Sequence, residues 1–135
     1  MAEAKYRTPK GTHDVLPEEQ RYMTYIKKAV RHRARQAGFS RIDTPIFELR
    51  DIFERGIGEH TDLVEKELYI VSSKQKDEKE DKEFALRPEF TASICRSYVE
   101  HAMDQLPQPV ELYSIGPLFR HDRPQKGRYR QFNQF

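Results

Sequence analysis

The sequence FRHDRPQKGRYRQFNQ, residues 119–134, combines a dense group of cations with the pattern of a β-hairpin. Two alternating segments, residues 110–119 and 128–135, flank a turn that contains Pro124 and Gly127. Five cations lie within eleven residues around this turn: Arg120, Arg123, Lys126, Arg128 and Arg130. Guanidinium groups held on a rigid element suit a polyanionic ligand. The hairpin therefore predicts a local structure and a candidate site together.

Alternation along a strand places Arg128, Arg130, Phe132 and Gln134 on one face of the second segment. Two guanidiniums, an aromatic ring and an amide suit a nucleotide, because cations bind phosphates and a ring stacks on a base. Arg120 can join this face from the partner segment. From spacing alone, a solvent-exposed face whose arginines pair with nearby carboxylates is at least as good an interpretation.

The composition limits the class of protein. The 135 residues are 36% hydrophobic and 34% charged, which indicates one domain, or part of one, with a heavily charged surface. A net charge of +2 argues against a general basic coat for nucleic acid. The single Cys95 excludes an internal disulfide and is expected to lie in a helix as a small core residue. The absence of a long apolar run and of a signal peptide favours a soluble, cytoplasmic protein.

Upstream of the hairpin, the pattern predicts a helix that starts at Pro17, near Asp14 as a capping residue, and stops at Gly38. Its apolar stripe comprises Met23, Ile26, Val30, Ala34 and Ala37. Residues 41–48 resemble a strand, and Pro45 suits an edge, a bulge or an interface because proline cannot donate to a β-ladder. A short helix is expected near residues 51–54.

The middle of the chain predicts paired strands at residues 67–73 and 83–87, joined by a solvated charged tip at 74–82. A helix should follow over residues 90–103, with Ile94, Tyr98 and Val99 facing inward. Because hairpins dominate this order, we expect an α+β domain whose mostly antiparallel sheet is flanked by helices.

Residues 86–92, LRPEFTA, form a second candidate site. Glu89 and Thr91 stand at the start of the predicted helix, where capping stabilises by ~0.3–1 kcal/mol and is the favoured interpretation. The functional alternative places Glu89 against a ligand ammonium, with Thr91 as a hydroxyl partner. No GxGxxG or P-loop motif is present, and singly placed histidines predict no metal site.

Five segments in order resemble class II aminoacyl-tRNA synthetases, and specifically the histidyl-tRNA synthetase family. They are an N-terminal signature at residues 8–14, motif 1 near 41–48, residues 61–69, residues 86–92 and motif 2 near 116–135. The resemblance implies that residues 1–135 form the N-terminal portion of the catalytic domain. Motif 3 and the anticodon-binding domain would then lie beyond Phe135. Three positions depart from the family pattern, with Asp122 in place of Glu, Phe90 in place of Gly and Asn133 in place of His.

The resemblance also implies site residues, with Arg120 catalytic. The ATP-binding residues would be Arg120, Asp122, Arg128 and Phe132. The histidine-binding residues would be Glu89, Phe90, Thr91, Arg120 and Gln134. The loop residues Arg123, Gln125 and Lys126 would face the tRNA acceptor end, and Pro45 would lie at a homodimer interface.

The implied reaction is ATP- and Mg²⁺-dependent activation of histidine, followed by its transfer to tRNA(His). Such a step depends on alignment and charge neutralisation, which arginines and Mg²⁺ supply. Two alternatives stay open. One is the histidine-sensing regulatory subunit of ATP phosphoribosyltransferase, a paralogue without ligase activity. The other is a small RNA-binding module that uses the basic hairpin, which a net charge of +2 makes the weaker of the two.

Overall fold

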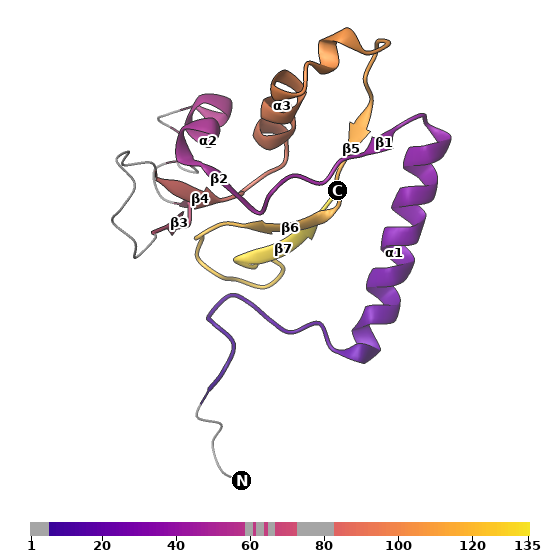
Figure 1. The fold of residues 1–135 in the computed structure, drawn as a ribbon. Coiled ribbons are helices and arrows are strands. Elements are labelled where there is room, and N and C mark those ends of the chain that lie inside the picture. The colour runs from indigo at the N-terminus through magenta and orange to yellow at the C-terminus, as the bar shows by residue number, and fades with distance from the viewer. Residues whose placement is uncertain (1–5, 59–60, 62–63, 65–66, 73–82) are drawn as a thin grey trace.

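The computed structural model describes residues 6–58, 61, 64, 67–72 and 83–135. Helices and short strands are interspersed along the chain, which confirms the expected α+β class (Figure 1). The helices are α1 (Pro17–Gln36), α2 (Arg50–Ile57), α3 (Thr91–Glu100) and the 3₁₀ turn η2 (Met103–Gln105). The strands are β1 (Ser40–Arg41), β2 (Phe47–Leu49), β3 (Ile70–Val71), β4 (Phe84–Leu86), β5 (Leu112–Tyr113), β6 (Gly116–Phe119) and β7 (Gln131–Gln134).

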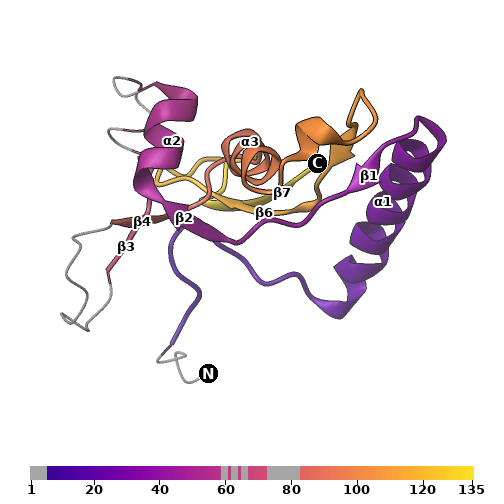
Figure 2. The same ribbon diagram turned by 45° about the horizontal axis from the view of Figure 1, so that its top comes forward.

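The strand pairs are mostly antiparallel, as expected. β4 lies between β2 and β3 with both neighbours antiparallel, and β6 pairs with β7 in the predicted hairpin. The exception is the parallel pair β1–β5. In the β6–β7 register Leu118 lies opposite Phe132 and Gly116 opposite Gln134. Figure 2 shows α2 and α3 on one side of the strands and α1 apart from them.

Helix α1 has the predicted boundaries but not the predicted environment. Pro17 occupies its first turn, and Gly38, with φ +88°, follows its end. The residue at the N-cap is Leu16, and no side chain caps the helix, so the expected role of Asp14 is wrong. No residue of α1 is buried. Met23, Ile26 and Val30 of its apolar stripe border a cavity of about 380 Å³ that also meets β7.

The compact part of the core lies between α2, α3 and β4, where Phe53, Ala85 and Ala92 form a buried cluster. The buried residues of α3 are the small Ala92, Ser93 and Ser97. At Ala92 the helices approach so closely that a Cβ added to Gly56 of α2 would lie 2.9 Å from its Cβ. The neighbouring groove between α2 and α3 is open, and Cys95 and Val99 border it together with Gly56 and Ala92. Two expectations are therefore wrong, since Val99 is 77% exposed and Cys95 is also exposed.

Two predicted strands are shorter in the structure. Residues 41–48 divide into β1 and β2, and the segment between them contains Pro45, which lacks a donor for a ladder. Residues 128–130 precede β7 instead of extending it, so they do not share the regular alternation of a strand. The pairing of residues 67–73 with 83–87 is confirmed by β3 and β4. The predicted tip at 74–82 lies outside the described residues.

Within the described ranges, the helices are too short or too polar to cross a membrane.

Candidate functional site

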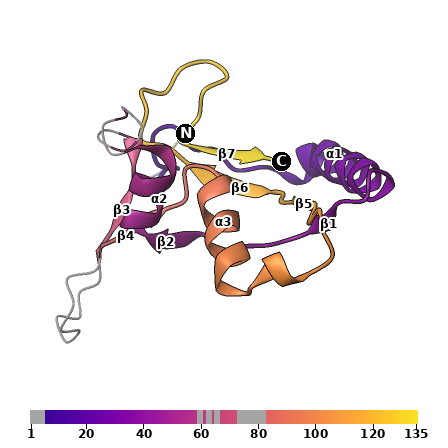
Figure 3. The ribbon, with the colours of Figure 1, turned by 90° about the horizontal axis from the view of Figure 1, so that it is seen from above.

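The β6–β7 hairpin and its loop form a cleft of about 370 Å³. Its lining residues are Arg120, Asp122, Gly127, Arg128, Tyr129, Phe132 and Asn133. The four side chains predicted to bind ATP all belong to this set. Seen from above, β6 and β7 run side by side, and the long loop that joins them extends beyond their ends (Figure 3). The hairpin therefore gathers two guanidiniums, a carboxylate and two aromatic rings around a single space.

Arg120 is held at two points within this cleft. Its Nε donates a hydrogen bond of 3.1 Å to the carbonyl of Pro88, in the segment before α3. Its Cζ lies 5.4 Å from the centroid of the Phe132 ring. Within the described part of the chain no carboxylate pairs with Arg120, so its positive charge is available to an anion.

Arg128 and Asp122 face each other across the base of the loop. Nε of Arg128 forms an ion pair with Oδ2 of Asp122, whose Oδ1 accepts a 2.6 Å hydrogen bond from the amide of Arg123. The Arg128 side chain is 56% exposed, whereas that of Asp122 is 21% exposed. Since the pair is partly solvated, it holds Arg128 only weakly, and a phosphate could compete with Asp122 for the guanidinium.

The loop between the strands closes on itself. The backbones of Gln125 and Arg128 exchange hydrogen bonds of 3.2 and 2.9 Å, which leaves Lys126 and Gly127 at the tip. Gly127 adopts a φ of +79°, a conformation that glycine reaches without strain. The predicted tRNA-facing residues Arg123, Gln125 and Lys126 are exposed on this loop.

Arg130 does not join the cleft, contrary to the expected shared face. Its Nε donates to the carbonyl of Asp122 at 3.0 Å, and its backbone amide donates to the carbonyl of Gly11 at 2.7 Å. Gly11, with φ +86°, touches this side chain so closely that an added Cβ would lie 2.8 Å from Cγ of Arg130. The N-terminal signature therefore supports the base of the loop, a role that the sequence did not indicate.

The predicted histidine-binding residues lie at several places. The carboxylate of Glu89 accepts hydrogen bonds from the amides of Thr91 and Ala92, the latter at 2.8 Å, so it caps α3. Thr91 is exposed and borders a groove between α2 and α3. Phe90 is 9% exposed, and Gln134 borders the cavity next to α1. Of this set, Arg120 alone lines the 370 Å³ cleft.

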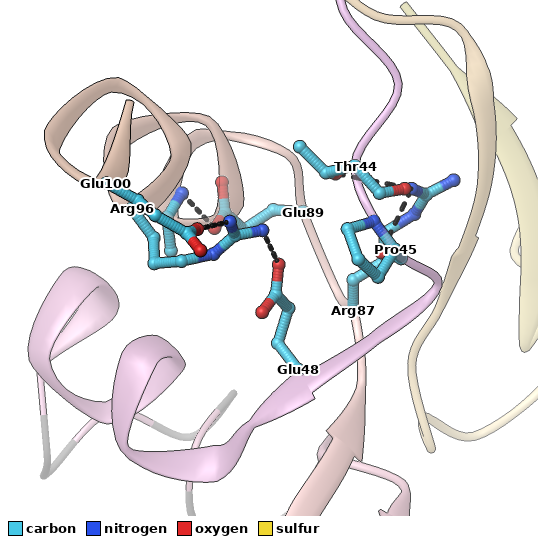
Figure 4. A network of polar contacts seen from close by, with 8 residues as sticks. Thr44, Pro45, Glu48, Arg87, Glu89, Arg96 and Glu100 are labelled. Atoms are coloured by element: carbon cyan, nitrogen blue, oxygen red, sulfur yellow. Dashed lines mark hydrogen bonds and ion pairs between the residues drawn. The ribbon is translucent and has the colours of Figure 1, made fainter. Parts of the chain in front are cut away.

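Arg87, which sequence reasoning did not select, is a buried cation beside these residues. It is 5% exposed, and burial lowers the pKa of its guanidinium from the ordinary value. In Figure 4 its side chain reaches the segment of Thr44 and Pro45. The same figure shows Arg96 of α3 between Glu48 and Glu100. The sequence offered one sign of the burial of Arg87, namely its position as a charged residue directly after the apolar strand residues 84–86.

Pro45, predicted at a dimer interface, is exposed and precedes two exposed apolar side chains. Ile46 is 47% exposed and Phe47 is 53% exposed. Three consecutive apolar residues on the surface are a feature of interaction sites, although single exposed apolar residues are common.

A comparison with protein families matches residues 11–135 to the model for histidyl-tRNA synthetase. Histidine–tRNA ligase of Desulforamulus reducens is 50% identical over 127 residues, which are 94% of this chain and 29% of that protein. The Staphylococcus aureus ligase is 47% identical over 130 residues, which are 96% of this chain and 30% of that protein. The crystal structure of apo S. aureus histidyl-tRNA synthetase superposes on this chain with a TM-score of 0.72 at 38% identity. The superposed region covers 95% of this chain and 27% of the chain in that structure.

The chain thus spans about 30% of the length of these curated relatives. The family match nevertheless includes the hairpin, its cleft and the segment before α3. On this match, the chain belongs to the histidyl-tRNA synthetase family.

Proposed function

We propose that this chain supplies the ATP-binding part of a histidine–tRNA ligase, as the N-terminal portion of its catalytic domain. The observation that carries the proposal is the Arg120 guanidinium, which pairs with no carboxylate of the described residues and lies beside the Phe132 ring, in a cleft that also contains Arg128. A nucleotide needs this combination, because its phosphates require cations and its base requires a flat apolar surface.

In the proposed reaction a carboxylate oxygen of histidine attacks the α-phosphorus of ATP, and pyrophosphate leaves. Arg120 would contact both the α-phosphate and the histidine carboxylate, and so bring two negatively charged groups together. Phe132 would stack on adenine, and Arg128 would move from Asp122 to the phosphates. The step transfers no proton, so alignment and charge neutralisation account for the catalysis that these residues would provide.

Histidine would bind next to this cleft. Glu89 would hold its ammonium group. Phe90, Thr91 and Gln134 would complete the pocket, and because they lie at different places in this structure, they would have to come together around the ligand. Because Glu89 already caps α3 through its carboxylate oxygens, this role requires the carboxylate to be shared between the helix and the ligand. A carboxylate has about four acceptor sites, so the two roles are compatible.

Mg²⁺ would enter this site with ATP. The cleft contains one carboxylate, that of Asp122, and this group is paired with Arg128. A protein site for Mg²⁺ ordinarily supplies one or two carboxylates together with substrate phosphates. The described residues of the cleft therefore do not form a separate magnesium site, and the ion would be held mainly by the phosphates of ATP.

The exposed loop residues Arg123, Gln125 and Lys126 would contact the acceptor end of tRNA(His), the proposed second substrate. The exposed apolar residues Pro45, Ile46 and Phe47 would form part of a homodimer interface. Both assignments fit the chemistry of the surfaces, since phosphates attract the cations of the loop and dimerisation would cover the apolar side chains.

A hybrid enzyme tests the proposal. It joins residues 1–135 to the part of the S. aureus relative that lies beyond the matched region, so that a chain of full family length is assayed. The assay is histidine-dependent exchange of pyrophosphate into ATP. Arg120→Ala should reduce exchange by at least about 100-fold, because a cation aimed at the reacting phosphate is lost. Arg31→Ala is the matched control, since Arg31 is an exposed arginine of α1 outside the cleft.

Absence of exchange in the unsubstituted hybrid would overturn the proposal. Histidine binding without exchange would favour the regulatory subunit of ATP phosphoribosyltransferase instead. Salt-sensitive RNA binding without ATP affinity would favour the RNA-binding module. Normal exchange in Arg120→Ala would remove the catalytic role of that residue while leaving the ligase assignment in place.

A further inference from the structure

Arg87 carries a buried positive charge that the proposed reaction does not use. The acceptors of its side-chain hydrogen bonds are neutral, chiefly backbone carbonyls. Nε donates to Pro117 at 3.1 Å, and Nη1 donates to the carbonyls of Thr44 at 2.7 Å and Pro45 at 3.2 Å. Within the described residues no carboxylate forms an ion pair with it. Burial lowers the pKa of the guanidinium more than the charges of Asp43 and Glu48 raise it, so the pKa stays lowered. Because no described carboxylate pairs directly with it, burial of this charge remains costly, and stability alone does not explain an arginine here.

The guanidinium connects segments that are far apart in the sequence. Its acceptors lie in residues 44–45, before β2, and at Pro117 in β6. The backbone of Arg87 binds the same two segments. Its amide donates to the carbonyl of Ile46 at 2.9 Å, and its carbonyl accepts from the amide of Phe119 at 3.0 Å. A planar group with several donors in a fixed geometry can hold two such segments at once, which a lysine ammonium does less well.

Two neighbours confine the guanidinium further. Its Cζ lies 4.8 Å from the centroid of the Phe90 ring, which stacks against the cation. On another side, a Cβ added to Gly116 would lie 2.8 Å from Nη2 of Arg87. Phe90, at a position where the family pattern has glycine, thus turns toward Arg87 in this structure and is 9% exposed. The orientation of the guanidinium is therefore determined on several sides.

The next residue connects this arrangement to the cleft. Pro88, which is fully buried, accepts the 3.1 Å hydrogen bond from Nε of Arg120. The peptide bond that follows Arg87 leads directly to this proline, and proline has little conformational freedom. A shift of Arg87 would therefore move the carbonyl that orients Arg120.

We propose that Arg87 is a positioning residue of the ligase reaction, which holds the Pro88 carbonyl in place and through it the guanidinium of Arg120. The inference rests on the proposed function of the cleft. Arg87 itself touches no substrate in this scheme. Its effect is transmitted through one hydrogen bond, and substitution should alter the rate of activation more than the binding of ATP, because Phe132 and Arg128 stay unchanged.

The test measures pyrophosphate exchange in the hybrid enzyme, with rates expressed per active site titrated by burst formation of adenylate. Arg87→Lys should lower kcat by about 10- to 100-fold, since displacement of a catalytic group by ~1 Å has effects of that size. The KM for ATP should change less than threefold. Gly116→Ala is a second variant, because its methyl group would displace Arg87 and alter no residue that lines the cleft.

A double-mutant cycle shows whether Arg87 acts through Arg120. In an Arg120→Lys background, Arg87→Lys should cause less than a twofold further loss of kcat, because the group that it positions is already gone. Arg96→Lys is the matched control, since Arg96 is a partly buried arginine paired with Glu48 and Glu100 and outside the cleft. It should reduce stability and leave kcat per active site within twofold.

Three results would overturn the inference while the unsubstituted hybrid remains active. The first is an unchanged kcat per titrated site in both Arg87→Lys and Gly116→Ala. The second is a loss of kcat from Arg87→Lys that is as large in the Arg120→Lys background as in the unsubstituted hybrid. The third is a loss of kcat in Arg96→Lys equal to that in Arg87→Lys. If the unsubstituted hybrid shows no exchange, the proposed function fails first, so the two failures are distinguishable.

Discussion

Arg96 forms ion pairs with two carboxylates that differ in burial, so one arginine allows a comparison of both environments. Its Nη2 pairs with Glu48 of β2, whose side chain is 9% exposed. Its Nη1 lies 2.5 Å from Glu100, four residues along α3, whose side chain is 56% exposed. Hydrogen bonding to Glu48 is the largest of the effects that raise the pKa of Arg96. Glu48 should therefore contribute more to stability than Glu100.

The isosteric changes Glu48→Gln and Glu100→Gln should each lower the free energy of unfolding, by different amounts. A hydrogen bond between charged groups contributes about 1.5–3 kcal/mol, and removal of one member of a fully buried pair costs about 3–5 kcal/mol. Arg96 is 26% exposed and keeps Glu100, so we expect a loss near the lower range, about 2 kcal/mol, for Glu48→Gln. An exposed pair at i,i+4 contributes about 0.3–0.5 kcal/mol, which is the loss expected for Glu100→Gln.

Urea unfolding followed by circular dichroism measures both losses. With a slope of about 1–3 kcal/mol per molar urea, Glu48→Gln should lower the midpoint by roughly 1 M, and Glu100→Gln by a quarter of that or less. Addition of 1 M NaCl should abolish the effect of Glu100→Gln and largely preserve that of Glu48→Gln, because salt screens exposed charges. Equal losses for the two variants, or equal sensitivity to salt, would show that burial does not set the strength of these pairs.

Three further predictions concern the loop, the ring and the thiol. Gly11→Ala should accelerate hydrogen exchange at the Arg120 and Arg130 amides by about 30-fold, because a left-handed φ costs an alanine ~1–2 kcal/mol and its methyl group meets Arg130. Unchanged protection would mean that the N-terminal segment does not hold the loop. Phe132→Leu should raise the KM for ATP in the hybrid enzyme about tenfold, since aromatic stacking on a base contributes ~1–3 kcal/mol, and an unaltered KM would argue against adenine stacking there. Cys95 should react stoichiometrically with a thiol reagent in the folded chain because it is exposed, and protection until unfolding would place it at a covered surface.

Much of the local structure was predictable because it depends on neighbouring residues. Pro17 and Gly38 set the ends of α1 through their own backbone preferences. The hairpin at residues 119–134 followed from alternation around Pro124 and Gly127, and its residues do meet in one cleft. Arg128 and Phe132 line this cleft together, but Arg130 turns away to the carbonyl of Asp122, so the predicted shared face was wrong for Arg130. Strand periodicity applies only within the strand itself, and Arg130 precedes β7.

The sequence by itself determined the chemical content of the site, namely which cations, ring and carboxylates are available and in what order. Tertiary structure decided which of them act together. Arg87 reaches carbonyls 43 and 30 residues away, and Cys95, expected in the core, borders an open groove between α2 and α3. Burial and hydrogen bonds between distant segments arise only when the chain is packed, so no local pattern around Arg87 could have indicated its partners.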